Sequence, residues 1–191
     1  MDAAIVRWLN SGVGAFRPLD EVIKALVSDY LVPVTLSLVL LGLWFLGRSS
    51  GERQRNQFAA MTGLGALGLV NLIVELVDDL FARDRPFVHL DLNLALFYPP
   101  TDPSFPSNPA ATAFAVAAGV FFWNRPLGIF AGVMGALWSV ARVYAGVHYP
   151  TDVIAGAVLG IVTALVVGRL MRLLSFIPMG LLRLLRHLSL A

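Results

Sequence analysis

The sequence predicts an all-α integral membrane protein, a helical bundle of five to six transmembrane helices. The chain has 191 residues, of which 58% are hydrophobic and only 14% are charged, whereas a soluble domain is about 45–50% apolar and about a quarter charged. Its mean hydropathy is +0.77. The apolar residues also gather in long continuous stretches. These three observations exclude an ordinary soluble domain.

Five apolar stretches are long enough, or nearly so, to cross about 30 Å of hydrocarbon as helices. In chain order they are Leu31–Gly47, Gln57–Val77, Pro109–Trp123, Pro126–Gly146 and Tyr149–Leu173. The mixed segment Met1–Phe16 predicts an interfacial helix, with a sixth span or a re-entrant segment as the alternative. The tail Phe176–Leu190 has two arginines among leucines. It predicts a basic amphipathic helix on anionic lipid or a plain cytoplasmic anchor.

The composition also excludes several kinds of chemistry. The chain has no cysteine, which excludes disulfides, thiolate nucleophiles and cysteine-ligated zinc. Three histidines leave little for a multi-histidine metal site. The single lysine, Lys24, follows no glycine-rich run, so the phosphate loop of nucleotide hydrolases is absent. We expect no metal, no cofactor and no nucleic-acid partner.

The charges of the connections orient the spans. The segment before the first span has a net charge of −1, and the connections that follow carry +2, −3 and +1. The C-terminal segment carries +4. The positive-inside rule places the basic segments in the cytoplasm. The acidic connection Asp78–Pro109 and the turn Gly146–Asp152 are therefore expected outside, in a prokaryotic plasma membrane.

Ionisable residues at membrane depth are costly and usually face an interior or a wet cavity. Four such places lie at the ends of the predicted spans, and the charge pattern assigns all of them to one face of the membrane. They are Asp78–Pro86, Phe105–Pro109, Arg142 and His148–Asp152. The chemistry is expected at this face.

His148 and Asp152 form the first candidate pair. Pro150 suits the first turn of a helix, where its missing N–H is not needed. In that helix His148 and Asp152, four residues apart, would share a face. The carboxylate could accept the proton of one imidazole nitrogen and leave the other as a nucleophile or base. The alternative is a pair that simply caps the helix.

Two arginines suggest an anion as the ligand. Arg142 and Arg85 each end an apolar span, and two guanidiniums can clamp a phosphate. Ser107 and Asn108 precede Pro109, so one of them is expected to cap a helix whose N-terminus also favours phosphate. Ordinary capping is the alternative for both. Together these residues predict a phosphoryl-transfer site that needs no metal.

The run Arg142–Asp152, with Arg85-Pro86 and Pro106-Ser107 upstream, resembles the type 2 phosphatidic acid phosphatases, or lipid phosphate phosphatases. They are the membrane branch of a superfamily shared with the vanadium haloperoxidases. The resemblance covers about residues 70–167 of one membrane domain, residues 1–191. It implies a helical bundle, usually of six spans, whose site at the extracytoplasmic face dephosphorylates lipid phosphates and diphosphates, including phosphatidate and polyprenyl diphosphates, through a phosphohistidine.

The same resemblance implies roles for individual residues. His148 would be the nucleophile, and Asp152 its orienting carboxylate. Arg85 and Arg142 would bind the phosphate, with Ser107 donating to one of its oxygens. The partners implied are a lipid phosphate substrate and the membrane lipids.

Three positions depart from the family's motifs. Asp78 stands where the family has a lysine, Pro109 where it has the histidine that protonates the leaving oxygen, and Ala141 where it has a serine. A phosphate leaving group needs little protonation, whereas an alkoxide needs much. We therefore predict a preference for lipid diphosphates or the use of another acid. His89 is the candidate acid, with a solvated loop residue as the alternative.

Two other functions compete with this one. A catalytically impaired relative would bind lipid phosphates without efficient hydrolysis, which the replacements at Asp78 and Pro109 favour. A CDP-alcohol phosphotransferase is the other, because the run Asp78–Arg83 echoes the metal-binding motif of that family.

Overall fold

The computed structural model describes residues 1–78, 80–94, 99–176, 178–180 and 182. Within these residues the regular structure is helical, in eight helices. They are α1 (Asp2–Asn10), α2 (Arg17–Val27), α3 (Leu31–Phe45), α4 (Ser50–Asp78), α5 (Pro86–His89), α6 (Asn108–Phe121), α7 (Arg125–Tyr144) and α8 (Pro150–Leu173). The all-α class predicted from composition is confirmed. The predicted basic tail lies mostly outside the described residues.

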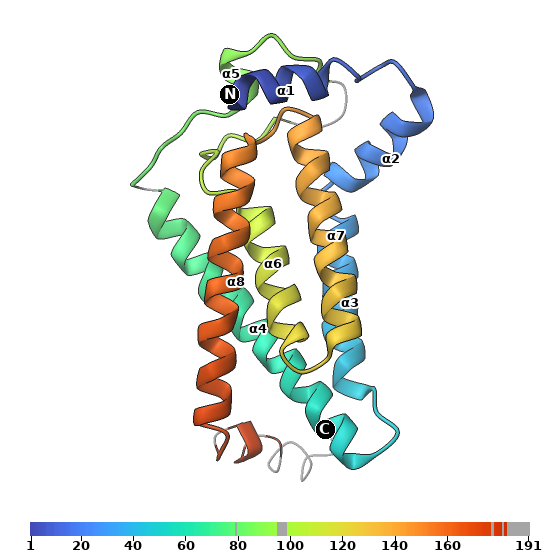
Figure 1. Ribbon diagram of the computed structural model, residues 1–191, viewed down its shortest axis with the longest axis vertical. Coiled ribbons are helices and arrows are strands. Elements are labelled where there is room, and N and C mark those ends of the chain that lie inside the picture. Colours follow the sequence, from blue (N-terminus) through green and yellow to red (C-terminus); the bar gives the residue numbers. More distant parts are fainter. Residues whose placement is uncertain (79, 95–98, 177, 181, 183–191) are drawn as a thin grey trace.

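Helix α6 is the centre of the bundle. It packs against α4, α7 and α8, while α3 packs against α4 and α7 (Figure 1). Its buried side chains are mainly alanines, and such small residues let neighbouring helices approach closely. On one side Val116 and Val120 of α6 meet the buried leucines of α3. On the other side α6 meets Val70 and Val74 of α4.

The number of membrane spans differs from the prediction. Three described helices, α4, α7 and α8, are long and apolar enough to cross a membrane. Helices α2 and α3, bent by 54° at their junction, pass the same test only together, either as one broken span or as a re-entrant loop. Helix α6 has only 14 residues, which is about 20 Å at 1.5 Å per residue, so it is short for a span. The predicted five to six spans are therefore not confirmed.

Most helix ends lie close to the predicted ones, with two exceptions. Helix α1 ends at Asn10, six residues before the end of the predicted segment Met1–Phe16, and α4 starts early. It starts at Ser50, seven residues before the predicted Gln57, because its hydrophilic first turns are capped. The Ser49 hydroxyl accepts a hydrogen bond from the Glu52 N–H at 3.2 Å. The Glu52 carboxylate in turn accepts one from the Arg48 N–H at 3.0 Å. Hydropathy alone misses such a polar start, since capping stabilises a helix whatever its apolar content.

Two glycines of α8 bring it against α6. A Cβ at Gly160 would lie 2.2 Å from the backbone oxygen of Ala111, and one at Gly156 would lie 2.4 Å from that of Ser107. Any side chain at these positions would push the helices apart. Gly156 therefore holds the start of α6 against the first turns of α8, where the candidate residues gather.

We expect Gly160→Ala to destabilise the protein by about 1–3 kcal/mol, the usual range for an overpacked core. Gly68→Ala is the matched control, because it makes the same change inside α4 where, among the described residues, the added Cβ has no neighbour within 4 Å beyond its own helix backbone. Thermal unfolding in one detergent checks both variants, at about 2–4 °C per kcal/mol for a chain of this size. Equal midpoints for the two variants would contradict the close packing of α6 on α8.

Candidate active site

The turn between α7 and α8 sets the position of His148. Gly146 has a φ of +80°, its N–H donates to the Val143 carbonyl at 3.0 Å, and the Val147 N–H donates to the Arg142 carbonyl at 2.9 Å. This is the Schellman arrangement, in which glycine adopts the left-handed conformation that ends a helix. His148 follows at once and lies just before the start of α8 at Pro150.

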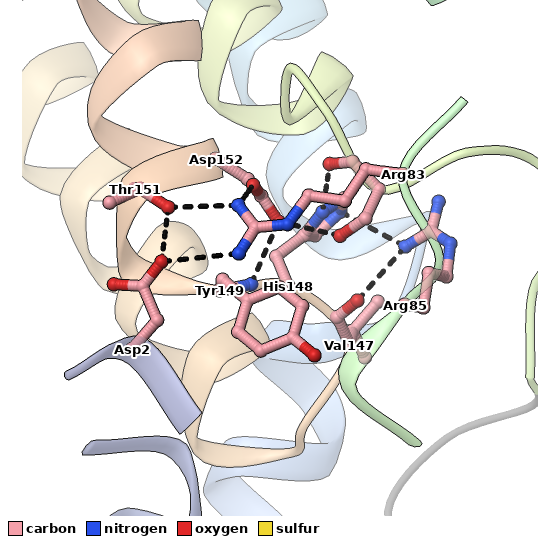
Figure 2. A network of polar contacts seen from close by, with 9 residues as sticks. Asp2, Arg83, Arg85, Val147, His148, Tyr149, Thr151 and Asp152 are labelled. Carbon is pink, nitrogen blue, oxygen red and sulfur yellow. Dashed lines mark hydrogen bonds and ion pairs between the residues drawn. The ribbon is translucent and has the colours of Figure 1, made fainter. Parts of the chain in front are cut away.

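His148 is buried, with 1% of its surface exposed, and both ring nitrogens have partners. Nδ1 lies 3.0 Å from the backbone oxygen of Ser104. Nε2 lies 3.2 Å from Nη1 of Arg85 (Figure 2). A carbonyl only accepts and a guanidinium only donates, so these partners assign the proton to Nδ1 and a lone pair to Nε2. The imidazole therefore presents an unprotonated nitrogen toward Arg85.

The surroundings of His148 favour its neutral form. Burial lowers the pKa of the imidazole well below its usual range, and the positive charges of Arg85 and Arg142 lower that pKa further. The hydrogen bond to Ser104 acts in the opposite direction but is the smallest contribution. An imidazole with a depressed pKa keeps its lone pair at neutral pH, as a nucleophile or base requires.

Arg85 is held rigidly beside the imidazole. It is 4% exposed, and its Nε and Nη2 donate to the backbone oxygen and the carboxylate of Asp102 at 2.9 and 2.8 Å. Nη1, which faces His148, also donates to the Val147 carbonyl at 3.2 Å. A cavity of about 300 Å³ lies beside Arg85 and is lined also by Arg83 and Asp102. The structure thus brings together Arg85 and His148, as the sequence predicts.

Arg142 is also buried near this pair, with 6% of its surface exposed. Its Nη1 donates to the Val27 carbonyl at 3.2 Å and to the Asp29 carboxylate at 2.8 Å. Its charge acts on both His148 and Arg85. The Nε of Arg142 has no hydrogen-bond partner within the described part of the chain. Nη1 of Arg142 is thus held by the protein, whereas the buried Nε–H is available to donate to an anion.

Asp152 is not hydrogen-bonded to His148, so the directly bonded pair expected from the spacing is wrong. Its carboxylate accepts from the Ser104 hydroxyl at 2.6 Å, from the Tyr149 N–H at 2.9 Å and from Arg83 Nη1 at 2.5 Å. The helical spacing fails because His148 precedes the helix, whose N-cap is Tyr149. Asp152 caps α8, which was the alternative reading of the pair, and reaches the imidazole only through Ser104.

Ser104 is the residue that sequence reasoning missed. Its carbonyl accepts from His148 while its hydroxyl donates to Asp152. It therefore links the two residues that the motif pairs. The contact to His148 uses the backbone, which every residue type has, so no sequence pattern could single out Ser104 for it.

Arg83 joins the site to the N-terminal helix. Its guanidinium donates to Asp152 and, at 2.9 Å, to the Thr151 hydroxyl. It also pairs with Asp2 at 3.2 Å, and it lies 4.0 Å from the centre of the Tyr149 ring. The Thr151 hydroxyl donates to the same Asp2 carboxylate (Figure 2). Helix α1 therefore lies across the end of the bundle above the site (Figure 1).

Ser107 and Asn108 take structural places at the start of α6. The Ser107 hydroxyl accepts from the Ala110 N–H at 3.5 Å, and its own N–H donates to the Asp152 carbonyl at 3.1 Å. Asn108 is exposed, and its side-chain oxygen accepts from the Thr112 hydroxyl at 3.0 Å. Ser107, one of the two residues predicted to cap this helix, is its N-cap, and Pro109 lies in the first turn. Asn108 is turned along its own helix.

His89 lies on an exposed turn. Its Nε2 lies 2.9 Å from the Asp84 carboxylate, and the two side chains are 60% and 63% exposed. His89 and Asp84 therefore form a solvated surface pair. A solvated loop residue was the alternative to a role for His89 as the acid.

Within the described residues, no group of three His, Cys, Asp or Glu side chains is placed to hold a metal ion. The positive charges around His148 come from arginines.

Comparison with known proteins adds to this geometry. Residues 59–175 match the PAP2 superfamily. The chain is 30% identical over 151 residues to undecaprenyl-diphosphatase BcrC of Bacillus subtilis, covering 79% of this chain and 75% of the relative. Aquifex aeolicus LpxE has a similar structure, with a TM-score of 0.65 and 25% identity, covering 87% of this chain and 93% of the other.

A second solved structure shares the fold. It is a transmembrane PAP2 type phosphatidylglycerolphosphate phosphatase from Bacillus subtilis, with a TM-score of 0.60 and 23% identity. The likeness covers 87% of this chain and 82% of that one.

The buried state of His148 predicts a specific pH dependence. Because the folded pKa lies below the unfolded value of about 6.5, the unfolded chain takes up a proton at this residue first as the pH falls. Acidification from about pH 7.5 to 5.5 should therefore destabilise the wild type more than His148→Gln. Thermal midpoints in one detergent measure this, with His89→Gln as the exposed-histidine control. If the thermal midpoints of the wild type and of His148→Gln fell equally as the pH falls, this would contradict a lowered pKa of His148 in the folded protein.

Proposed function

Because the chain belongs to the PAP2 superfamily, we propose that it is a membrane phosphatase that hydrolyses a lipid diphosphate of the polyprenyl class through a phosphohistidine on His148. The observation that carries this proposal is the buried neutral imidazole, whose Nε2 lone pair faces Arg85 at 3.2 Å. The relationship to an undecaprenyl-diphosphatase supports the substrate class. Membership of this family also removes the CDP-alcohol phosphotransferase interpretation.

In the first step Nε2 attacks the terminal phosphorus of the diphosphate, so that the N–P bond forms as the bond to the lipid-phosphate oxygen breaks. Water then attacks the phosphohistidine, which releases inorganic phosphate and restores His148. A phosphate entering between His148 and Arg85 would take over the Arg85 Nη1 hydrogen bond, which frees the lone pair as the anion arrives. The Nε of Arg142, which has no hydrogen-bond partner among the described residues, and the Ser107 hydroxyl are further donors for phosphate oxygens. Such fixed charges stabilise the transferring phosphoryl group without a metal ion.

Asp152 acts in this scheme as a positioning residue. It holds the Ser104 hydroxyl, and the Ser104 carbonyl holds the Nδ1–H of His148. When Nε2 becomes phosphorylated the ring gains positive charge, which the carbonyl and the nearby carboxylate stabilise. Arg83 keeps the Asp152 carboxylate in place from the other side.

The leaving group decides the substrate preference. Pro109 replaces the family's acid, and a missing general acid typically costs about 10²–10⁴ in rate. This loss matters most when an alkoxide leaves, as from phosphatidate or a prenyl monophosphate. A diphosphate releases a lipid phosphate, which leaves as a stabilised anion.

The orientation proposed for the site follows from charge. At the opposite end of the bundle, the first turns of α4 carry Arg53 and Arg55, α7 starts at Arg125, and the last turn of α8 carries Arg172. The positive-inside rule assigns that end to the cytoplasm. His148 would then work at the extracytoplasmic face of a prokaryotic plasma membrane.

A lipid-phosphate binder without efficient hydrolysis is the second candidate. The replacements at Asp78 and Pro109, which remove a lysine and an acid from the family's motifs, favour it. Binding of vanadate without phosphate release from any lipid would support this binder over the enzyme.

Phosphate release in detergent tests the proposed function. We expect undecaprenyl diphosphate to be hydrolysed faster than undecaprenyl phosphate, phosphatidate or phosphatidylglycerol phosphate. EDTA should leave the rate unchanged. His148→Ala should lose at least about a thousandfold, the order of loss when a nucleophile is removed. Faster turnover of the monophosphates would overturn the preference, and activity that survives in His148→Ala would overturn the mechanism.

A second experiment restores the missing acid. Pro109→His should raise monophosphate turnover by about 10–100-fold, within the range of general acid catalysis, and change diphosphate turnover little. His89→Ala is the companion variant, and we expect it to match the wild type on both substrates, because His89 is exposed and paired with Asp84. A selective loss of monophosphate turnover in His89→Ala would instead identify His89 as the acid.

A further inference from the structure

A second cavity lies at the end of the bundle opposite His148. It has a volume of about 430 Å³ and is formed where α4 starts, α6 ends and α7 starts. Helix α7 runs from this cavity to the site over 20 residues, or about 30 Å at 1.5 Å per residue. The cavity is therefore separate from the candidate active site. Its lining includes Glu52, Arg55, Phe121, Trp123, Asn124 and Arg125.

The cavity carries an excess of positive charge. Arg55 and Arg125 line it from two helices and are exposed. Within the residues that the structure describes, neither forms an ion pair. Arg172 of α8 adds a third guanidinium, which lies 4.0 Å from the ring centre of Phe122. Glu52, the carboxylate in the lining, already accepts a hydrogen bond from the Arg48 N–H. These charges favour an anion.

The wall that carries the arginines is rigid. The indole N–H of Trp123 donates to the Thr62 hydroxyl at 2.8 Å, and its ring packs on Phe58 with 5.1 Å between ring centres. The side-chain amide of Asn124 donates to the buried Asn56 at 2.9 Å. These bonds join the α6–α7 turn to α4, so Arg55 and Arg125 face the cavity from a preformed frame.

The cavity is also amphipathic. Phe121, in its lining, is 45% exposed, and Ile129 and Phe130 on the next turn of α7 are 58% and 45% exposed. Exposed apolar side chains on membrane-spanning helices lie against acyl chains. A ligand that fits both parts has an anionic head and an apolar tail, which a free anion lacks. Basic pockets between transmembrane helices are typical sites for such headgroups.

We propose that this cavity binds the phosphate headgroup of an anionic phospholipid from the leaflet opposite the candidate active site. The guanidiniums of Arg55 and Arg125 contact the headgroup phosphate, and the acyl chains lie over Phe121 and the apolar side chains of α7. A ligand that binds only the folded protein stabilises it. The lipid would therefore hold together the ends of α4, α6 and α7. This inference does not depend on the catalytic proposal.

The experiment measures thermal unfolding in nanodiscs of phosphatidylcholine that contain from none to about a third phosphatidylglycerol. We expect a saturable rise of several degrees in the midpoint of the wild type. The double variant Arg55→Gln/Arg125→Gln should need at least about tenfold more phosphatidylglycerol for the same rise. Arg7→Gln/Arg17→Gln is the matched control, because it removes the same charge from exposed residues of α1 and α2. The control should behave as the wild type.

Three outcomes would overturn the proposal. They are an unchanged wild-type midpoint, an equal response of the two double variants, and an equal rise caused by inorganic phosphate or glycerol phosphate in phosphatidylcholine alone. The last would identify a soluble anion as the ligand. Arg125→Glu provides a second variant, which should weaken the response more than Arg125→Gln does, and native mass spectrometry of the wild type should retain bound phosphatidylglycerol.

Discussion

The contact on which the rest of the site depends is the hydrogen bond between Nδ1 of His148 and the backbone oxygen of Ser104, 3.0 Å long. It fixes the tautomer, so that Nε2 faces Arg85 with a lone pair. The bond forms because the segment before α6 is held against the first turn of α8. Ser107 and Ser104 both bond to Asp152 there, and Gly156 leaves room for the Ser107 backbone. The packing of α8 against the segment before α6 therefore also determines which nitrogen of the His148 ring carries the lone pair.

Asp152 has a different place from the one its spacing suggests. Its carboxylate caps α8, accepts a hydrogen bond from the Ser104 hydroxyl and pairs with Arg83. Arg83 in turn pairs with Asp2 of α1. The N-terminal helix is therefore connected to the imidazole by a continuous series of polar contacts. Loss of charge at Asp152 would loosen both the site and the helix that lies across it.

The two ends of the bundle differ in how their charges are used. At the His148 end, each buried arginine has a carboxylate partner, Asp102 for Arg85 and Asp29 for Arg142. At the opposite end, Arg172 lies over an aromatic ring and the arginines of the second cavity line open space. Buried guanidiniums need such partners because an unpaired charge is costly away from water, whereas arginines at a membrane surface can take theirs from lipid headgroups.

The sequence by itself determined the helical class and most helix ends, because these depend on local signals. Long apolar runs, prolines in first turns and capping serines act within a few residues. Only the tertiary structure decided that Ser104, 44 residues before His148 in the chain, holds its ring, and that α1 reaches Asp152 through Arg83. The first contact uses a backbone carbonyl, which every residue type has, so the sequence does not mark it. The second joins residues far apart in the chain, which meet only when the helices pack. The bend of 54° between α2 and α3 also belongs to the tertiary structure and has no counterpart in the hydropathy pattern.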